Sequence, residues 1–158
     1  MPTNTQSMDY AGSSAPLLSE ILTKVNNAKM KEDKVKVLKQ NDSVPLRQVL
    51  KGAFDPKIIW DLPEGTPPYK ENEAPAGTEH TLLYTESKRL WHFVKGADNR
   101  TSKTRKEMLY IQMLEGLHAD EAKLLIAVKE KNLNTIYKGL TDAVVKEAFG
   151  WNDDYKTA

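Results

Sequence analysis

Apolar residues recur at three- and four-residue steps along most of the chain, the spacing that places side chains on one face of an α-helix. The pattern is strongest over residues 105–149, where it predicts helices over 105–116, 119–131 and 142–149. We expect this stretch to form the most stable part of the core. Its predicted buried positions are Met108, Leu109, Ile111, Met113, Leu114, Ala122, Leu125, Ile126, Leu133, Val144, Val145, Ala148 and Phe149.

The ends of these helices carry residues that suit helix termini. Gly116 can take the left-handed conformation that closes a helix, and His118 stands at the cap position of the next one. Asp120 follows at the positive end of that helix dipole. Thr141 is expected to cap the last helix through its hydroxyl.

Helices are also predicted nearer the N-terminus, over about 16–27, 31–39 and 45–54, with short polar turns between them. A further helix is predicted over 81–94, with Leu83, Leu90, Trp91 and Val94 on its buried side. Short turns between short helices favour antiparallel neighbours in a small bundle.

The segment 55–79 differs from the rest of the chain. It holds five of the eight prolines, so no helix can run through it, yet it is too rich in aromatic and branched residues for a free linker. It carries six acidic residues against two lysines, whereas residues 24–51 carry eight basic residues against three acidic ones. We therefore expect a proline-rich loop that crosses the helices and lies over part of the basic ones.

These patterns predict an all-α fold: a single-domain bundle of about six short helices crossed by the long proline-rich loop. Residues 1–15 are rich in Ser, Thr, Asn and Gly and are expected to form a flexible tail. The helical domain is expected to span 16–151, with a C-terminal tail over 152–158.

Bulk composition narrows the function classes. Lysine and arginine number 23 against 22 aspartates and glutamates, so the whole molecule lacks the strong positive field of a dedicated nucleic-acid coat. There is no cysteine, which favours an intracellular setting. No apolar run approaches the roughly 20 residues that a membrane span needs, and no signal peptide is visible, so we expect no membrane association.

Residues that could carry chemistry are sparse. The three histidines, His80, His92 and His118, show no metal-ligand spacing, and capping or surface roles are favoured for them. The carboxylate pairs 120–121 and 153–154 suit a helix start and a solvated tail better than a cation site. No phosphate-cradling glycine motif is present. We therefore expect no catalytic, cofactor-binding or metal-binding residue, and a protein that is not an enzyme.

Two groups of residues are candidates for contacts with a partner. The aromatic side chains Trp60 and Tyr69 in the proline-rich loop are of the types enriched at interface hot spots, although packing against the protein's own helices is the favoured interpretation. A basic group is a candidate for nucleic-acid contact, although a solvated helix face is the commoner reason for such a run. That group comprises Lys31, Lys34, Lys36, Lys39 and Arg47.

Several segments resemble an uncharacterised family of small proteins from T4-like tailed phages. The resemblance is carried by PLRQVLKGAFDP at 45–56 and LPEGTPPYK at 62–70, and it continues through 93–96, 105–118, 137–141 and 147–149. It covers roughly residues 17–151, and the proline-rich loop is its most specific part. The family has no assigned activity, so the resemblance implies a phage origin and a host-cell setting and carries over no site residue.

The leading hypothesis is a non-enzymatic phage accessory protein that binds another protein, either a host factor or a phage assembly component. The alternative is a nucleic-acid-associated accessory factor that uses the lysine-rich helix, which the overall charge balance disfavours. The expected location is the cytoplasm of the host cell, with association with the virion as a further option.

Overall fold

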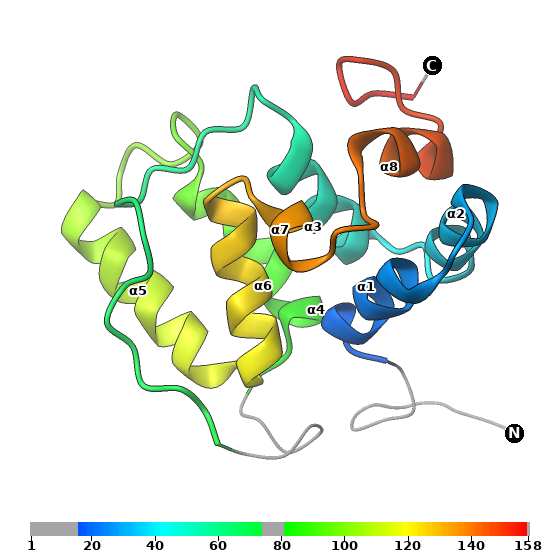
Figure 1. The fold of residues 1–158 in the computed structure, drawn as a ribbon. Coiled ribbons are helices and arrows are strands. Elements are labelled where there is room, and N and C mark those ends of the chain that lie inside the picture. The colour runs from blue at the N-terminus through cyan, green and yellow to red at the C-terminus, as the bar shows by residue number, and fades with distance from the viewer. Residues whose placement is uncertain (1–15, 74–80, 158) are drawn as a thin grey trace, which may run out of the picture.

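The computed structural model describes residues 16–73 and 81–157, and within them the chain is helical (Figure 1). In chain order the elements are α1 (Leu18–Asn27), α2 (Lys31–Gln40), α3 (Val44–Phe54), α4 (Leu83–Glu86), the 3₁₀-helix η1 (Ser87–Phe93), α5 (Lys103–Gly116), α6 (Ala119–Lys129), α7 (Leu133–Ile136) and α8 (Asp142–Phe149). The prediction of an all-α, single-domain protein is confirmed. There are more helices than the six or so expected, partly because α4 and α7 are single turns that periodicity does not resolve.

The helix α6 lies at the centre of the fold and contacts α1, α3, α5 and α7. Its side chains are buried on most sides, since Ala122, Leu124, Leu125, Ala127 and Val128 all lie in the core. At one side of the molecule α8 packs against α2, and α2 packs against α1 (Figure 1). The last helix therefore closes the bundle against the first ones.

Two predicted caps are confirmed. The Nδ1 atom of His118 accepts a hydrogen bond from the Asp120 amide at 3.1 Å, and the Thr141 hydroxyl accepts one from the Val144 amide at 3.3 Å. The expectation for Gly116 was wrong, because this glycine does not have a positive φ. Its carbonyl instead accepts a hydrogen bond from the Thr81 amide at 3.0 Å.

The buried face of α5 differs from the predicted one. Met108 is 46% exposed, whereas Lys106 and Tyr110 are buried together with Met113 and Leu114. Counting only apolar residues missed the true stripe, because a lysine can bury its aliphatic stem when its amine finds oxygen partners. Residues 106, 110, 113 and 114 have the three- and four-residue spacing of one helix face.

Trp91 was also placed wrongly by the sequence pattern. The predicted helix over 81–94 becomes a 3₁₀-helix at Ser87. A 3₁₀-helix has three residues per turn, so the buried positions become Ser87, Leu90 and Phe93. Trp91 is turned outward and is 50% exposed.

The C-terminal residues were expected to be a tail, but those that the structure describes fold back on the body. Tyr155 is buried, and its hydroxyl donates a hydrogen bond to Asp142 Oδ1. Trp151 pairs with Thr157 in an isolated antiparallel bridge and packs on Phe149, with ring centroids 5.0 Å apart. Residues 1–15, the expected N-terminal tail, lie outside the described residues.

Residues 55–73, which we call the strap, form no helix and connect α3 with the region before α4. In Figure 1 the strap leaves the end of α3 and runs across α5. Residues 74–79 of the expected proline-rich loop lie outside the described part of the chain. The structure therefore shows the path of 55–73 only.

Candidate partner-binding cleft

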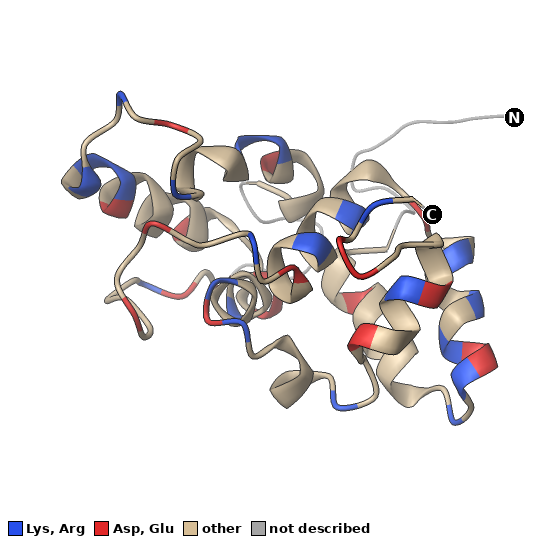
Figure 2. Cartoon of the chain, turned by 90° about the horizontal axis from the view of Figure 1, so that it is seen from above, with Lys and Arg blue, Asp and Glu red and all other residues tan. Residues whose placement is uncertain are grey.

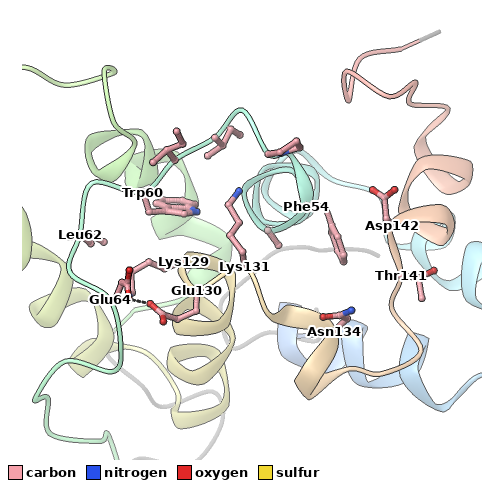
Figure 3. Close-up of a pocket in the computed structure, with 14 residues that line it drawn as sticks. Phe54, Trp60, Leu62, Glu64, Lys129, Glu130, Lys131, Asn134, Thr141 and Asp142 are labelled. Atoms are coloured by element: carbon pink, nitrogen blue, oxygen red, sulfur yellow. Dashed lines mark hydrogen bonds and ion pairs between the residues drawn. The ribbon is translucent and has the colours of Figure 1, made fainter.

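A cleft of about 600 Å³ lies where the strap and α3 meet the C-terminal end of α6 (Figure 3). Phe54 of α3 and the strap residues Ile58, Ile59, Trp60 and Leu62 supply its apolar side. Its polar side comes from Glu64, Lys129, Glu130, Lys131, Asn134, Thr141 and Asp142. The volume lies within the roughly 300–1,000 Å³ that is typical of ligand pockets in proteins.

Trp60 fixes the strap against α3 beside this cleft. Its indole N–H donates a hydrogen bond to the Gly52 carbonyl at 3.1 Å, and the ring lies directly over that glycine. A Cβ atom on Gly52 would meet Trp60 Cζ2 at 2.7 Å, so this close approach requires a glycine.

The strap also pairs with the chain that follows η1. Asp61 donates its amide hydrogen to the Phe93 carbonyl at 2.7 Å, and Lys95 donates its own to the Ile59 carbonyl at 2.7 Å. These bonds flank the antiparallel bridge between Trp60 and Val94. Backbone pairing therefore holds this part of the strap in a fixed register.

Lys129, the last residue of α6, holds the strap on the side of the cleft. The buried Lys129 amine donates to the carbonyls of Pro63 at 2.8 Å and Gly65 at 2.9 Å, and it forms an ion pair with Glu130. Lys129 lowers the pKa of the Glu130 carboxyl, which also accepts the Gly65 amide at 3.0 Å. The first turn of the strap past Leu62 is thus bound through its backbone.

Lys131 closes the C-terminal end of α3 in the same way. Its amine donates to the carbonyls of Gly52 at 2.7 Å and Asp55 at 2.8 Å, and in Figure 3 it points up between Trp60 and Phe54. Burial lowers the pKa of Lys131, and the nearby Asp55 carboxylate opposes that shift. Lysines often bond the last carbonyls of a helix, and here the lysine comes from the turn between α6 and α7.

Further along, the strap is bound to α5. The buried Lys106 amine lies 3.1 Å from Asp61 Oδ2 and donates to the Asp98 carbonyl at 2.7 Å. The Lys70 amide donates to Glu115 Oε2 at 2.8 Å. The strap was expected to lie over the basic residues of 24–51, and for α2 that expectation was wrong, because the lysines that bind it lie in α5, at the end of α6 and in the turn after α6.

The far wall of the cleft is tied to the C-terminal segment. Asp142 accepts a hydrogen bond from Tyr155 and forms an ion pair with Lys146 at 3.0 Å. Burial, together with Asp142, raises the pKa of Tyr155 to about 12. The charged groups that border the cleft are therefore largely engaged by the fold itself.

Comparison with protein families places the chain in one of them. A model of the family of unknown function DUF6433 matches residues 21–135. The chain belongs to DUF6433. The match includes the strap, α5 and α6, whereas Thr141 and Asp142 lie beyond its end. Neither the curated proteins nor the solved structures gave a match.

The two aromatic residues predicted as partner contacts both pack on the core of this DUF6433 protein. Trp60 and Tyr69 are half-buried, and only Trp60 lines the cleft. Burial and the nearby Glu71 raise the pKa of Tyr69. A role for either side chain in binding a partner stays a prediction.

The residues predicted to contact nucleic acid have different contacts in the structure. Lys34 donates to the carbonyls of Val25 and Ala28, which closes α1. Lys31 forms an ion pair with Glu147 at 3.1 Å.

Arg47 binds Asp42 through two hydrogen bonds of 2.7 Å and lies over the Phe149 ring. Lys36 and Lys39 are exposed beside a shallow groove on α2. Basic and acidic positions intermingle along the chain (Figure 2). A nucleic-acid role for α2 remains a prediction that this geometry does not favour.

Glu121 was expected to be solvated at the start of a helix, but it is buried and has a structural role. Its carboxylate accepts the Ser19 amide and the Leu83 amide, each at 3.1 Å, and so joins the starts of α1 and α4 to α6. The available signal was its spacing, because Glu121 lies three and four residues before the buried Leu124 and Leu125 on the same helix face.

Among the other candidates, His80 lies outside the described residues. His92 Nδ1 lies 2.8 Å from Asp98 Oδ2. Within residues 16–73 and 81–157, no group of three potential metal ligands comes together. No helix in those ranges is both long and apolar enough to cross a membrane.

Proposed function

We propose that this DUF6433 protein is a non-enzymatic accessory protein that binds another protein, a host factor or a phage assembly component, through the cleft. One observation carries the proposal. The cleft has a substantial apolar wall that remains in contact with solvent, and Ile59 on that wall is 55% exposed. An exposed apolar side chain on a rigidly held segment is suited to entering a partner's surface.

The state of the charged residues supports binding as the role of the cleft. Lys129, Lys131 and Asp142 already have hydrogen-bond or ion-pair partners within the fold. If these residues gave up their internal hydrogen bonds and ion pairs to bind a ligand, the strap would open or the C-terminal segment would be released. A partner that fills the apolar side leaves these bonds intact.

A rigid wall also lowers the cost of binding. The strap beside Ile59 is held by backbone pairing, by the Trp60 hydrogen bond and by Lys129. Ordering an interface side chain costs about 0.5–1.5 kcal/mol, and a preorganised wall avoids part of that cost. The strap therefore supports the proposal as the framework of a binding surface.

The phage setting of the proposal rests on the resemblance carried by residues 45–56 and 62–70. We propose that the protein acts in the cytoplasm of the infected host cell. If its partner is a phage assembly component, we propose that the protein is incorporated into the virion. Both segments contribute residues to the cleft or the strap, and they flank Ile59 on either side in the sequence.

The test compares two charge insertions at exposed apolar positions. Ile59→Asp places a charge in the cleft, and Met108→Asp places the same charge on α5 away from it. Tagged wild type and the two variants are expressed in infected host cells, and the captured proteins are quantified by mass spectrometry.

We expect one defined protein to be captured by wild type and Met108→Asp and lost with Ile59→Asp. Equal capture by all three proteins, with circular dichroism showing them folded, would remove the cleft from the proposal.

A further inference from the structure

A second surface lies on the other side of Trp60 from the cleft and is built by α4, η1 and the end of α3. We call it the aromatic–basic surface and define it by Tyr84, Lys88, Trp91 and Lys51. Tyr84 is 51% exposed, about as much as Trp91, so two large rings stand in solvent on one short helical segment. The cleft described above does not include any of these four residues.

The backbone explains how these side chains come to lie together. Leu83, Ser87 and Leu90 make the buried stripe of this segment. Tyr84, Lys88 and Trp91 follow each of them by one residue and so form a neighbouring stripe with the same spacing. Within the 3₁₀-helix, residues three apart lie one above the other, which places Lys88 next to Trp91.

The Trp91 ring is held in place on one face. It stacks on His92, with ring centroids 3.8 Å apart and an interplanar angle of 29°. His92 is itself fixed by Asp98, a buried carboxylate that also accepts the Arg100 and Thr101 amides at 2.9 Å and 3.2 Å. A large ring with a supported position is a preorganised platform for stacking.

A shallow groove of about 160 Å³ runs beside this platform between η1 and α3. Its charged lining consists of Lys51 and Lys88, and the rest is Gln48, Gly52, Ser87 and apolar or aromatic residues. The groove is smaller than the roughly 300 Å³ at which small-molecule sites begin. It therefore favours a partner that lies along the surface over a small molecule enclosed in the groove. The nearby Arg89 is paired with Glu86 at 2.8 Å.

We propose that the aromatic–basic surface binds single-stranded nucleic acid. Trp91 and Tyr84 stack on unpaired bases, and Lys51 and Lys88 neutralise the phosphates between and beside them. Aromatic platforms next to cationic side chains are the general means of binding single strands without sequence preference. The aromatic–basic surface is separate from the protein-binding cleft, and strand binding there does not depend on the cleft.

The dimensions suit a short stretch of strand. Seven residues separate the two rings, and at a rise of about 1.5–2.0 Å per residue they stand roughly 10–14 Å apart along the helix. At the roughly 3.4 Å per nucleotide of a strand within a duplex, that distance spans about three or four nucleotides, and a more extended single strand spans it with fewer. Both rings can therefore engage one strand.

Charge favours this occupant over a protein. Both charged residues of the groove are cationic, which complements a polyanion, whereas the cleft on the other side of Trp60 is bordered by both signs. A duplex fits less well, because its bases are stacked on each other and are not free to stack on Trp91. The charge balance of the whole chain still limits affinity, so binding is expected to be weak and salt-dependent.

The test uses fluorescein-labelled 12-mers of deoxythymidine and of uridine, and a 12-base-pair duplex, in anisotropy titrations at low salt. We expect both single strands to bind more tightly than the duplex. Trp91→Ala should weaken single-strand binding by roughly 5- to 150-fold, the effect of losing one stacked base, whereas Trp91→Phe should retain most of it. The two single-stranded probes distinguish DNA from RNA as the preferred form.

The lysines are tested by salt dependence with a matched control. Lys51→Ala with Lys88→Ala should reduce the slope of log affinity against log salt by about 1.4, because each contact to a single-strand phosphate contributes about 0.7. Lys36→Ala with Lys39→Ala removes the same charge from α2 and should leave the slope unchanged. Tryptophan fluorescence should fall on adding the strand to wild type, and this response should be lost in Trp91→Phe.

Three results would overturn the proposal. One is no binding to either single strand at low salt by a protein that circular dichroism shows to be folded. Another is equal loss of binding from the α2 pair and the Lys51–Lys88 pair, which would make the binding non-specific. The third is a Trp91→Ala protein that binds the oligonucleotides as tightly as wild type but no longer captures the partner protein from infected cells. That result would make this surface a protein interface.

Discussion

Replacement of Lys129 by methionine tests how the strap is held to the body. Methionine keeps a long apolar stem in the buried position and removes only the charged amine. The carbonyls of Pro63 and Gly65 then lose their donor, and Glu130 loses its ion-pair partner. The backbone pairing around Trp60 is left in place.

The size of the effect follows from these contacts. A hydrogen bond that involves a charged group contributes about 1.5–3 kcal/mol, and removing one partner of a buried ion pair costs about 3–5 kcal/mol. The strap carbonyls and Glu130 regain some water when the amine is lost, since Gly65 is exposed and Glu130 is half-buried. We expect Lys129→Met to lower the free energy of unfolding by about 2–4 kcal/mol.

Urea unfolding followed by circular dichroism measures this change, with Lys123→Met as the matched control. Lys123 lies on the same helix and is exposed, so its replacement should change stability by less than about 0.5 kcal/mol. Hydrogen exchange adds a local measurement, because the Gly65 amide bonds Glu130. That amide should exchange faster in Lys129→Met than in wild type.

Equal stabilities of the Lys129→Met and Lys123→Met proteins would refute this reasoning. It would mean that the amine of Lys129 does not bind the strap in solution. Unchanged exchange at Gly65 with a large global loss would instead assign Lys129 to the core of the body and not to the strap.

Three further outcomes are expected. Leu125→Ala should cost about 2–5 kcal/mol in urea unfolding, because the side chain is 1% exposed at the centre of α6, and a cost near zero would contradict that placement. Gly52→Ala should destabilise by about 1–3 kcal/mol despite the better helix propensity of alanine, since its Cβ would displace Trp60, and an acrylamide-quenching assay should show greater access to Trp60. The pKa of Tyr155 is raised to about 12, so its stabilising contribution is present below about pH 10 and is lost as the pH rises toward 12. Tyr155→Phe should therefore lose less stability between pH 9.5 and 11.5 than wild type, and equal losses would contradict the shift.

Much of the fold could be predicted because helix boundaries depend on the chemistry of residues close together in the sequence. The last helix was expected at 142–149 and lies there, and Thr141 caps it. The turn at His118 was likewise readable from the residues around it. These features depend on residues that are neighbours in the sequence, so they can be predicted from the sequence alone.

What could not be predicted depends on contacts between distant residues. Lys106 and Lys129 look like solvent-exposed lysines in the sequence. Nothing local shows that the Asp61 carboxylate lies within reach of the Lys106 amine, or that strap carbonyls lie within reach of the Lys129 amine. The change to a 3₁₀-helix at Ser87 moved Trp91 to the surface, and periodicity assumed an α-helix. Loop paths and helix types of this kind follow from packing.

The candidate cleft was predictable only in one of its parts. Trp60 was singled out because it is a large aromatic residue in a proline-rich segment, and it lies in the wall of the cleft. Lys131 and Asp142 were not singled out, since each gains its place from elements that are far apart in the chain. A pattern of single residues does not show which loops meet.

The most direct test of partner binding is photo-crosslinking from the wall of the cleft. A photoreactive phenylalanine derivative replaces Ile59 in one protein and the exposed Glu107 of α5 in another. Both are expressed in infected cells and irradiated, and the products are identified by mass spectrometry. The account requires a discrete adduct with one protein from position 59 and none with that protein from position 107, whereas identical products from both positions, or none from position 59, would contradict it.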